Sequence, residues 1–180
     1  MRKTLEPLLM TTASSRRIKN FHVVTDGIYR GAQPTPEDIE VLARMGVKTI
    51  ISLRCGRRAA ATEKAAAEAA GIRYENIPLS YWKVPDEQTI DRFLDLVSDP
   101  INRPAFVHCF HGADRTGLLI ACYRVARLGW SFQEAYDEMK RCGFHRFGVR
   151  HYKWVLWAYA QRAQLRQSGN NQAVLSVTRT

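Results

Sequence analysis

The sequence lacks long apolar runs, and this absence excludes a class of protein. No apolar run in its 180 residues reaches the roughly 18 residues that a membrane-spanning helix needs. The opening stretch MRKTLEPLLMTTASSRR carries early positive charges, but Glu6 and Pro7 interrupt its apolar patch. Such a stretch is a poor signal peptide. We therefore expect a chain without a transmembrane segment.

Cysteine is scarce and scattered, with four residues in the chain. The four form no CxxC pair, and the histidines near them complete no recognisable ligand spacing, which argues against a zinc cluster. A disulfide framework is not expected in a chain of this length with an ordinary core. We therefore predict no metal site, and a reducing, cytoplasmic compartment in which a free thiolate persists.

Acidic residues are few relative to basic ones. The 17 Asp and Glu against 27 Lys and Arg leave a formal net charge of +10. One interpretation is a solvated basic surface; the other is an anionic partner, such as a phosphorylated molecule, an acidic protein patch, a lipid headgroup or nucleic acid. Charge alone does not choose among these.

The pattern of strands and helices predicts an α/β domain around a central, mostly parallel sheet flanked by helices. Asp26-Gly27 predicts a type I′ hairpin turn, and Thr35 with Pro36 predicts a helix start. We divide the chain into a loose arm (residues 1–18), one domain (19–167) and a polar tail (168–180). Strands are expected over residues 21–24, 28–30, 47–53, 72–79 and 104–108, and helices over residues 36–45, 59–70, 85–99, 117–128, from 131 onward, and 151–167.

One stretch carries chemistry: "VHCFHGADRTG" over residues 107–117. Cys109 follows a predicted buried strand, where open α/β sheets place their ligands. Five residues separate it from Arg115, whose planar fork suits two oxygens of a tetrahedral anion. The segment then enters a helix near Thr116, so backbone N–H groups and the helix dipole favour an anion. We call residues 109–115 the Cys–Arg loop and interpret it as a phosphate cradle.

A cysteine in a positively charged cradle has the character of a nucleophile. Positive surroundings and a helix N-terminus stabilise its thiolate, and a thiolate beneath a bound phosphate is aimed at phosphorus. The expected product of its attack is a phosphocysteine that water later hydrolyses. His108 is expected to order the loop by hydrogen bonding. The hydroxyl of Thr116 is expected to stabilise the thiolate that departs in the second step.

"HCFHGADRTG" resembles the HCxxGxxRTG signature of the cysteine-dependent protein tyrosine phosphatase superfamily. The flanks over residues 21–147 resemble the atypical dual-specificity phosphatases, of the plant-and-fungal type and their small bacterial relatives. The resemblance implies a dual-specificity-phosphatase-like fold, Cys109 as nucleophile, Arg115 as the phosphate-binding arginine, and no metal or cofactor. It also implies that loop amides bind the substrate phosphate, those of Phe110, His111, Gly112, Ala113 and Asp114.

The general acid that protonates the leaving oxygen is sought outside the loop. In "YWKVPDEQ", Asp86 follows Trp82 and Pro85 in an order similar to the acid loop of tyrosine phosphatases. Asp86 also stands at a predicted helix start, where a carboxylate stabilises the helix without catalysis. Glu87 and a mechanism without a protein acid are the alternatives. Asp114 is a less favoured acid, because its charge opposes phosphate unless it points away or meets a basic partner.

The expected activity is hydrolysis of phosphotyrosine and of phosphoserine or phosphothreonine in a phosphorylated protein. A second candidate substrate class is a small phosphorylated molecule: a phosphoinositide, an inositol (pyro)phosphate or an RNA 5′-phosphate. A module that binds phosphate without turnover is the non-enzymatic alternative, and no stable nucleic-acid partner is expected. Two basic clusters, one around Arg54 and one over residues 140–153, are read as solvated faces or as a substrate clamp.

Overall fold

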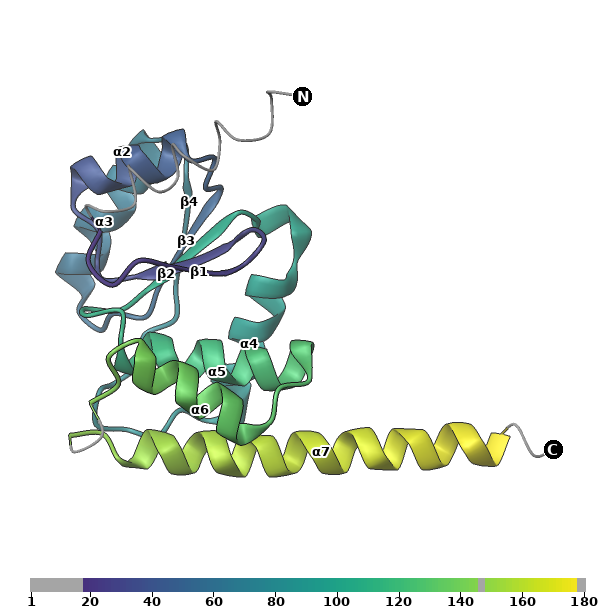
Figure 1. Cartoon of the computed structure of the whole chain (residues 1–180). Helices are drawn as coiled ribbons and strands as arrows, with labels where there is room; N and C mark the ends of the chain where they lie inside the picture. The colour runs from purple at the N-terminus through teal and green to yellow at the C-terminus, as the bar shows by residue number, and fades with distance from the viewer. Residues whose placement is uncertain (1–17, 146–147, 178–180) are drawn as a thin grey trace, which may run out of the picture.

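The computed structural model describes residues 18–145 and 148–177, which form a five-stranded sheet with helices on both faces (Figure 1). The strand order is β1-β2-β5-β3-β4; the β1–β2 pairing is antiparallel and the other three are parallel. This confirms the predicted fold class. In chain order the elements are β1 (His22–Thr25), β2 (Ile28–Gly31), α2 (Pro36–Arg44), β3 (Thr49–Ser52), α3 (Arg57–Ala69), β4 (Arg73–Asn76), α4 (Glu87–Ser98), the 3₁₀ turn η1 (Pro100–Asn102), β5 (Ala105–His108), α5 (Asp114–Leu128), α6 (Phe132–Arg141) and α7 (His151–Val177).

The helix starts follow local capping chemistry. Thr35 caps α2 and Ser131 caps α6, each in a reciprocal capping box with the acidic residue three positions later. Gly46, just beyond α2, has a φ of 80°, a left-handed conformation that glycine adopts without a steric penalty. The helix start predicted at Thr35 is confirmed.

The hairpin turn between β1 and β2 differs from the prediction. A type I′ turn needs positive φ at both central residues, but of the two only Gly27 has one, at 74°. The pairing instead contains a register shift between Val23 and Thr25. A bulge of this kind supplies extra local twist, so the strands pair without the mirror-image turn.

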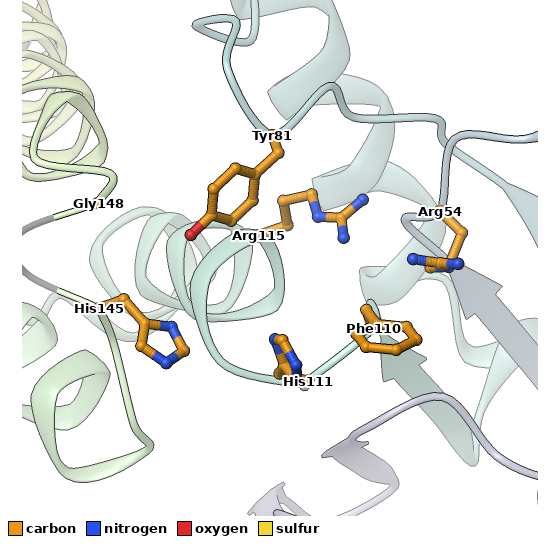
Figure 2. Close-up of a pocket in the computed structure, with 7 residues that line it drawn as sticks. All are labelled: Arg54, Tyr81, Phe110, His111, Arg115, His145 and Gly148. Atoms are coloured by element: carbon orange, nitrogen blue, oxygen red, sulfur yellow. The ribbon is translucent and has the colours of Figure 1, made fainter.

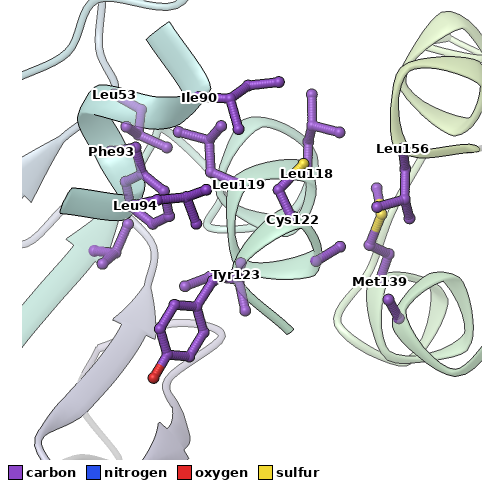
Figure 3. Close-up of a cluster of buried hydrophobic side chains, with 14 of the residues drawn as sticks. Leu53, Ile90, Phe93, Leu94, Leu118, Leu119, Cys122, Tyr123, Met139 and Leu156 are labelled. Carbon is purple, nitrogen blue, oxygen red and sulfur yellow. The ribbon is translucent and has the colours of Figure 1, made fainter. Parts of the chain in front are cut away.

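Two hydrophobic clusters fill the two faces of the sheet. Successive residues of one strand enter different clusters, as pleating requires: Phe106 faces α2 and α3, while Val107 faces the side of α4 to α7. Helix α5 is the centre of the larger cluster, with Leu118, Leu119 and Cys122 fully buried between α4, α6 and α7 (Figure 3). Because α5 is buried on all sides, it holds the Cys–Arg loop, which leads into it, in a fixed position.

The chain ends partly depart from the expected boundaries. The predicted arm lies outside the described residues except for Ile18, which is buried against the α2 and α3 face. The final helix was expected to end at residue 167, but α7 continues to Val177 and extends beyond the other helices (Figure 1). Once a helix is nucleated on a packed face, each further residue adds a hydrogen bond, which offsets the polar composition. Among the described residues, no helix has the length and apolarity to cross a membrane.

Candidate active site

The Cys–Arg loop begins at the centre of the sheet. Strand β5 is the last strand in the sequence but lies between β2 and β3, so the chain reaches Cys109 with a parallel strand on each side. His108, the residue before it, pairs in register with Gly31 of β2 and Ser52 of β3. Three carboxyl ends of parallel strands therefore meet beneath the loop, which is where α/β sheets bind ligands.

Helix α5 begins at Asp114, earlier than the predicted entry near Thr116. The turn into it is made at Gly112, whose φ is 68°. The early start places Arg115 and Thr116 in the first helical turn, next to the positive end of the helix dipole. The loop thus joins the strand to the helix through Phe110, His111, Gly112 and Ala113.

Arg115 is held by the ends of two other strands. Its Nη1 donates hydrogen bonds to the carbonyl oxygens of Leu53 (3.2 Å) and Leu79 (3.3 Å), which follow β3 and β4. The residue is 8% exposed, and its buried Nε has no hydrogen-bond partner among the described residues. The guanidinium is therefore anchored on one side and keeps a donor for an anion.

Cys109 and Thr116 are both buried close to the start of α5. Cys109 is 2% exposed and is a free thiol, as are the other three cysteines. The Thr116 side chain is fully buried, and its Oγ1 has no partner among the described residues. A buried hydroxyl without a partner is unfavourable, so this group is available to donate to a species formed at the loop.

His108 takes part in a buried network that the sequence analysis missed. Its Nε2 lies 2.6 Å from Oε1 of Glu63 on α3, and its Nδ1 lies 3.1 Å from the carbonyl oxygen of Cys109. The His108–Glu63 pair lies directly behind the candidate nucleophile, as a close buried contact that lacks hydrogen-bond geometry. The predicted ordering role of His108 has a structural counterpart in this contact.

Glu63 is an unusual residue for a buried helix face. It is 5% exposed, and its Oε2 also lies within 3.4 to 3.5 Å of donors on Gln33, Ser52 and Tyr74. Such donors offset the cost of burying a carboxyl group. The sequence signal was present: Glu63 and Ala67 share one face of the alanine-rich helix, but their burial depends on the sheet beneath.

Asp114 does not face the anion site alone; it meets a basic partner. Its Oδ1 accepts a hydrogen bond from the backbone N–H of His145 (2.8 Å), and its Oδ2 lies 2.9 Å from the imidazole Nδ1 of the same residue. The carboxylate is buried, and it ties the segment after α6 to the start of α5. Burial, and next the charge of Asp114, raise the pKa of Tyr81. Asp114 therefore has the basic partner, His145, that a carboxylate in the loop was expected to need.

Asp86 is placed at a helix end. It is the N-cap of α4, and its exposed carboxylate accepts a hydrogen bond from the backbone N–H of Thr89 (2.8 Å). Hydrogen bonds from Thr89 lower the pKa of Asp86. Glu87, the alternative acid, pairs with Arg166 of α7. The structure brings neither carboxylate to the cavity beside the Cys–Arg loop, so an acid role for Asp86 stays a prediction from the sequence.

A cavity of about 530 Å³ opens beside the Cys–Arg loop (Figure 2). The side chains in it are cationic, aromatic or imidazole groups, and its described lining contains no carboxylate. Arg54 stacks over the ring of Phe110, with Cζ 4.7 Å from the ring centroid. Figure 2 shows Arg115 pointing into the space between Tyr81 and Arg54. The lining residues are Arg54, Tyr81, Phe110, His111, Arg115, His145 and Gly148.

Part of this lining is predicted by the sequence. The motif indicates Phe110, His111 and Arg115, whereas Arg54 fits either a solvated face or a clamp. No sequence signal points to Tyr81, and His145 lies within the basic cluster over residues 140–153. No spacing rule links these residues to the motif, because they reach the cavity from separate loops.

Comparison with known proteins identifies the family. The family described as "DSP-PTPase phosphatase fused to NAD+ Kinase" matches residues 11–156. The chain belongs to this family. The match covers every strand and all helices except part of α7, so it includes the whole Cys–Arg loop.

Individual relatives carry two kinds of name. The chain is 31% identical over 125 residues to the dual specificity protein phosphatase TpbA of Pseudomonas aeruginosa, covering 69% of this chain and 55% of that protein. It is 30% identical over 131 residues to the inositol diphosphatase SIW14 of Saccharomyces cerevisiae, covering 70% and 46%. The chain thus spans about half the length of these two relatives.

Solved structures of both relatives share the fold. The core catalytic domain of the PP-IP phosphatase SIW14 from S. cerevisiae has a TM-score of 0.68 at 26% identity, covering 86% of this chain and 94% of that one. P. aeruginosa TpbA has a TM-score of 0.67 at 25% identity, covering 83% and 92%. By family and by fold, this chain therefore belongs to the atypical dual-specificity phosphatase group of the protein tyrosine phosphatase superfamily.

Proposed function

We propose that this chain is a cysteine-dependent phosphatase that hydrolyses phosphomonoesters, with Cys109 as the nucleophile and Arg115 as the phosphate-binding arginine. One observation carries the proposal. A buried cysteine at the centre of the sheet and an anchored arginine at the start of α5 border the same loop, and the cavity beside them has no carboxylate in its described lining. Such a site attracts an anion and places a thiol next to it.

The proposed reaction has two steps. The thiolate of Cys109 attacks phosphorus, an S–P bond forms, and the P–O bond to the leaving group breaks. A water molecule then attacks phosphorus, the S–P bond breaks, and inorganic phosphate and the thiolate are released. Loop amides and the guanidinium of Arg115 bind the phosphoryl oxygens as charge develops on them. The unpartnered hydroxyl of Thr116 donates to the departing thiolate.

Phosphotyrosine in a protein is the proposed first substrate, with phosphoserine and phosphothreonine as further ones. Tyr81 and Phe110 line the cavity, and their rings suit an aryl group by offset or edge contacts. One relative is named a dual specificity protein phosphatase, and a solved structure of a TpbA variant is in complex with pTyr. These facts support the proposal by similarity.

An inositol diphosphate is the second candidate substrate, and Arg54 favours it. Arg54 lines the cavity next to Arg115, and its Nε is buried without a hydrogen-bond partner among the described residues. His111 and His145 stand on the same lining, and each adds positive charge when protonated. A ligand with several phosphates contacts these two histidines together with Arg54 and Arg115. The names of SIW14 and its plant relatives as inositol diphosphatases agree with this candidate.

The deciding experiment is a panel of phosphate esters assayed with wild type, Cys109→Ser and Cys55→Ser. The panel holds an aryl phosphate, phosphotyrosine, phosphoserine and phosphothreonine peptides, a phosphoinositide, an inositol diphosphate and a 5′-triphosphorylated RNA. Cys55 is an exposed free cysteine, so its serine variant controls for loss of any thiol. We expect phosphate release by wild type and Cys55→Ser, and none by Cys109→Ser.

The pattern of release separates the substrates. A preference for phosphopeptides supports the protein-phosphatase proposal, and a preference for the inositol diphosphate transfers the assignment to the second candidate. Activity in Cys109→Ser would refute the mechanism. Phosphate binding by wild type without release from any ester would mean that the chain is a binding module.

The acid assignment has its own test. If Asp86 protonates the leaving group, Asp86→Asn lowers the rate more for alkyl phosphates than for aryl phosphates with good leaving groups. Asp99→Asn serves as the control, because the carboxylate of Asp99 also caps a helical turn, by accepting a hydrogen bond from the backbone N–H of Ile101. An equal, small effect of Asp86→Asn on both esters would leave Asp86 as a helix cap.

For the compartment, we propose the cytoplasm. All four cysteines are free, and a nucleophilic thiolate persists in a reducing environment.

A further inference from the structure

Arg30 is a buried arginine beneath the Cys–Arg loop, and the mechanism above does not use it. It lies on β2 and is 1% exposed. Its Nη2 donates to the carbonyl oxygen of Gly112 at 2.7 Å and contacts that of Ala113 at 3.4 Å. The side chain also packs against α5, since a Cβ on Gly117 would lie 3.6 Å from the same nitrogen. Arg30 therefore touches both the turn of the loop and the helix that follows.

The charge of Arg30 has no carboxylate partner among the described residues. Its Nε and Nη1 are buried without hydrogen-bond partners there, and burial lowers its pKa. Glu138 attracts it, but that carboxylate already forms two hydrogen bonds with Arg124, at 3.0 and 2.7 Å. An uncompensated buried cation is costly. An anion at the loop would offset this cost.

Three groups near Arg30 carry negative charge or can acquire it, in the order Cys142, Glu138 and Cys109 by their effect on Arg30, and Cys109 is the one that lies in the loop. The titratable and charged groups that interact with Arg30 come from β1, α5, α6 and the loops, and Arg124 among them opposes its charge. Burial, and next the charge of Arg30, lower the pKa of His22. Cys142 is another thiol, and burial raises its pKa. The interacting groups are His22, Cys109, Arg124, Glu138 and Cys142.

We propose that Arg30 is a positioning residue that holds the Gly112 carbonyl beneath the loop and stabilises negative charge on Cys109 and on the bound phosphate. Because a trans peptide points its C=O and N–H in opposite directions, fixing the Gly112 carbonyl toward Arg30 turns the N–H of Ala113 away from it, as an anion on the other side of the loop requires. The buried charge of Arg30 adds to the attraction of Arg115 without contacting the substrate. This inference rests on the proposed function of Cys109.

The test compares Arg30→Met, Arg30→Lys and the control Arg103→Met. Arg103 also donates to a backbone carbonyl, that of Val97 at 2.9 Å, but precedes β5 at the end opposite Cys109. The first readout is alkylation of Cys109 by neutral iodoacetamide, followed on the Cys109 peptide by mass spectrometry from about pH 6 to above the ordinary thiol range of about 8.5. The second readout is the inhibition of aryl phosphate turnover by inorganic phosphate.

We expect Cys109 in Arg30→Met to be alkylated about tenfold more slowly than in wild type near pH 6. At high pH, where the thiol is ionised in both proteins, the two rates should be equal. Arg30→Lys keeps the charge, so it retains most of the low-pH reactivity, but it loses the planar fork and binds phosphate more weakly. Arg103→Met matches wild type in both readouts.

Unchanged alkylation profiles and phosphate inhibition in both Arg30 variants would overturn the proposal. If the alkylation rate of Cys109 fell by the same factor at every pH, the charge role would also be overturned, because Arg30 would then only shape the loop. If Arg30→Met does not fold, Arg30→Lys decides through its phosphate inhibition. The alkylation readout needs no turnover, so failure of the proposed function, seen as no Cys109-dependent phosphate release by wild type, is distinguishable from failure of this inference.

Discussion

Replacing Gly112 by alanine tests whether the Cys–Arg loop must touch the end of β2. A Cβ at this position would lie 2.3 Å from the carbonyl carbon and oxygen of Gly31 and 2.6 Å from the nitrogen of Ala32. These are backbone atoms, and ordinary contact begins at 3.4 Å, so the loop or the strand must move by about 1 Å.

Two costs add in Gly112→Ala. Its φ of 68° places an alanine in the left-handed region, at about 1–2 kcal/mol. Relieving the backbone overlap costs about 1–3 kcal/mol more. The sum of about 2–5 kcal/mol is a large part of the 5–15 kcal/mol that stabilises a typical domain.

Gly71→Ala is the matched control, because Gly71 has a φ of 73° and nothing within 4 Å of its Cβ position. It carries the backbone strain without the overlap. Urea unfolding of both variants therefore isolates the contact, and we expect Gly112→Ala to be less stable than Gly71→Ala by about 1–3 kcal/mol. Turnover of an aryl phosphate should fall about 100-fold in Gly112→Ala, because a displacement of 1 Å misplaces the loop amides, and remain normal in Gly71→Ala.

Equal destabilisation of the two variants, together with normal turnover in Gly112→Ala, would refute the close approach of the loop to β2. It would also remove the steric reason for glycine in the motif, leaving only its backbone conformation.

Three further predictions concern buried polar groups. Glu63→Gln should lower the free energy of unfolding by about 1–3 kcal/mol and reduce turnover, because His108 loses its carboxylate; unchanged values in both assays would contradict the pairing. Asp114→Asn removes a negative charge beside the loop, so inorganic phosphate should inhibit more strongly; unchanged inhibition would count against this. Burial raises the pKa of Tyr74 from 10.0 to about 12, so its neutral phenol supports folding fully below pH 10 and this support is lost as the pH rises toward 12. Tyr74→Phe should lose less stability than wild type over that interval in urea unfolding, and equal losses would contradict the shift.

The sequence by itself determined the local features of this protein. The helix start at Thr35 and Pro36 and the strand before Cys109 each depend on residues within a few positions of one another, so they can be predicted from the sequence. The same holds for the spacing of Cys109 and Arg115, which one turn brings to a single loop. Family and fold class followed from these local patterns.

Tertiary structure alone decided which distant groups support the loop. Glu63 meets His108, and Arg30 meets Gly112, because β5 inserts between β2 and β3, and hydrophobic alternation fixes the face of a residue but not the order of the strands. The length of α7 and the turn at Gly27 also differ from the prediction, because helix propagation and a bulge outweighed local preference. Asp86 is the N-cap of α4, as its place at a predicted helix start indicated, while its role as an acid stays a prediction from the order "W…PD".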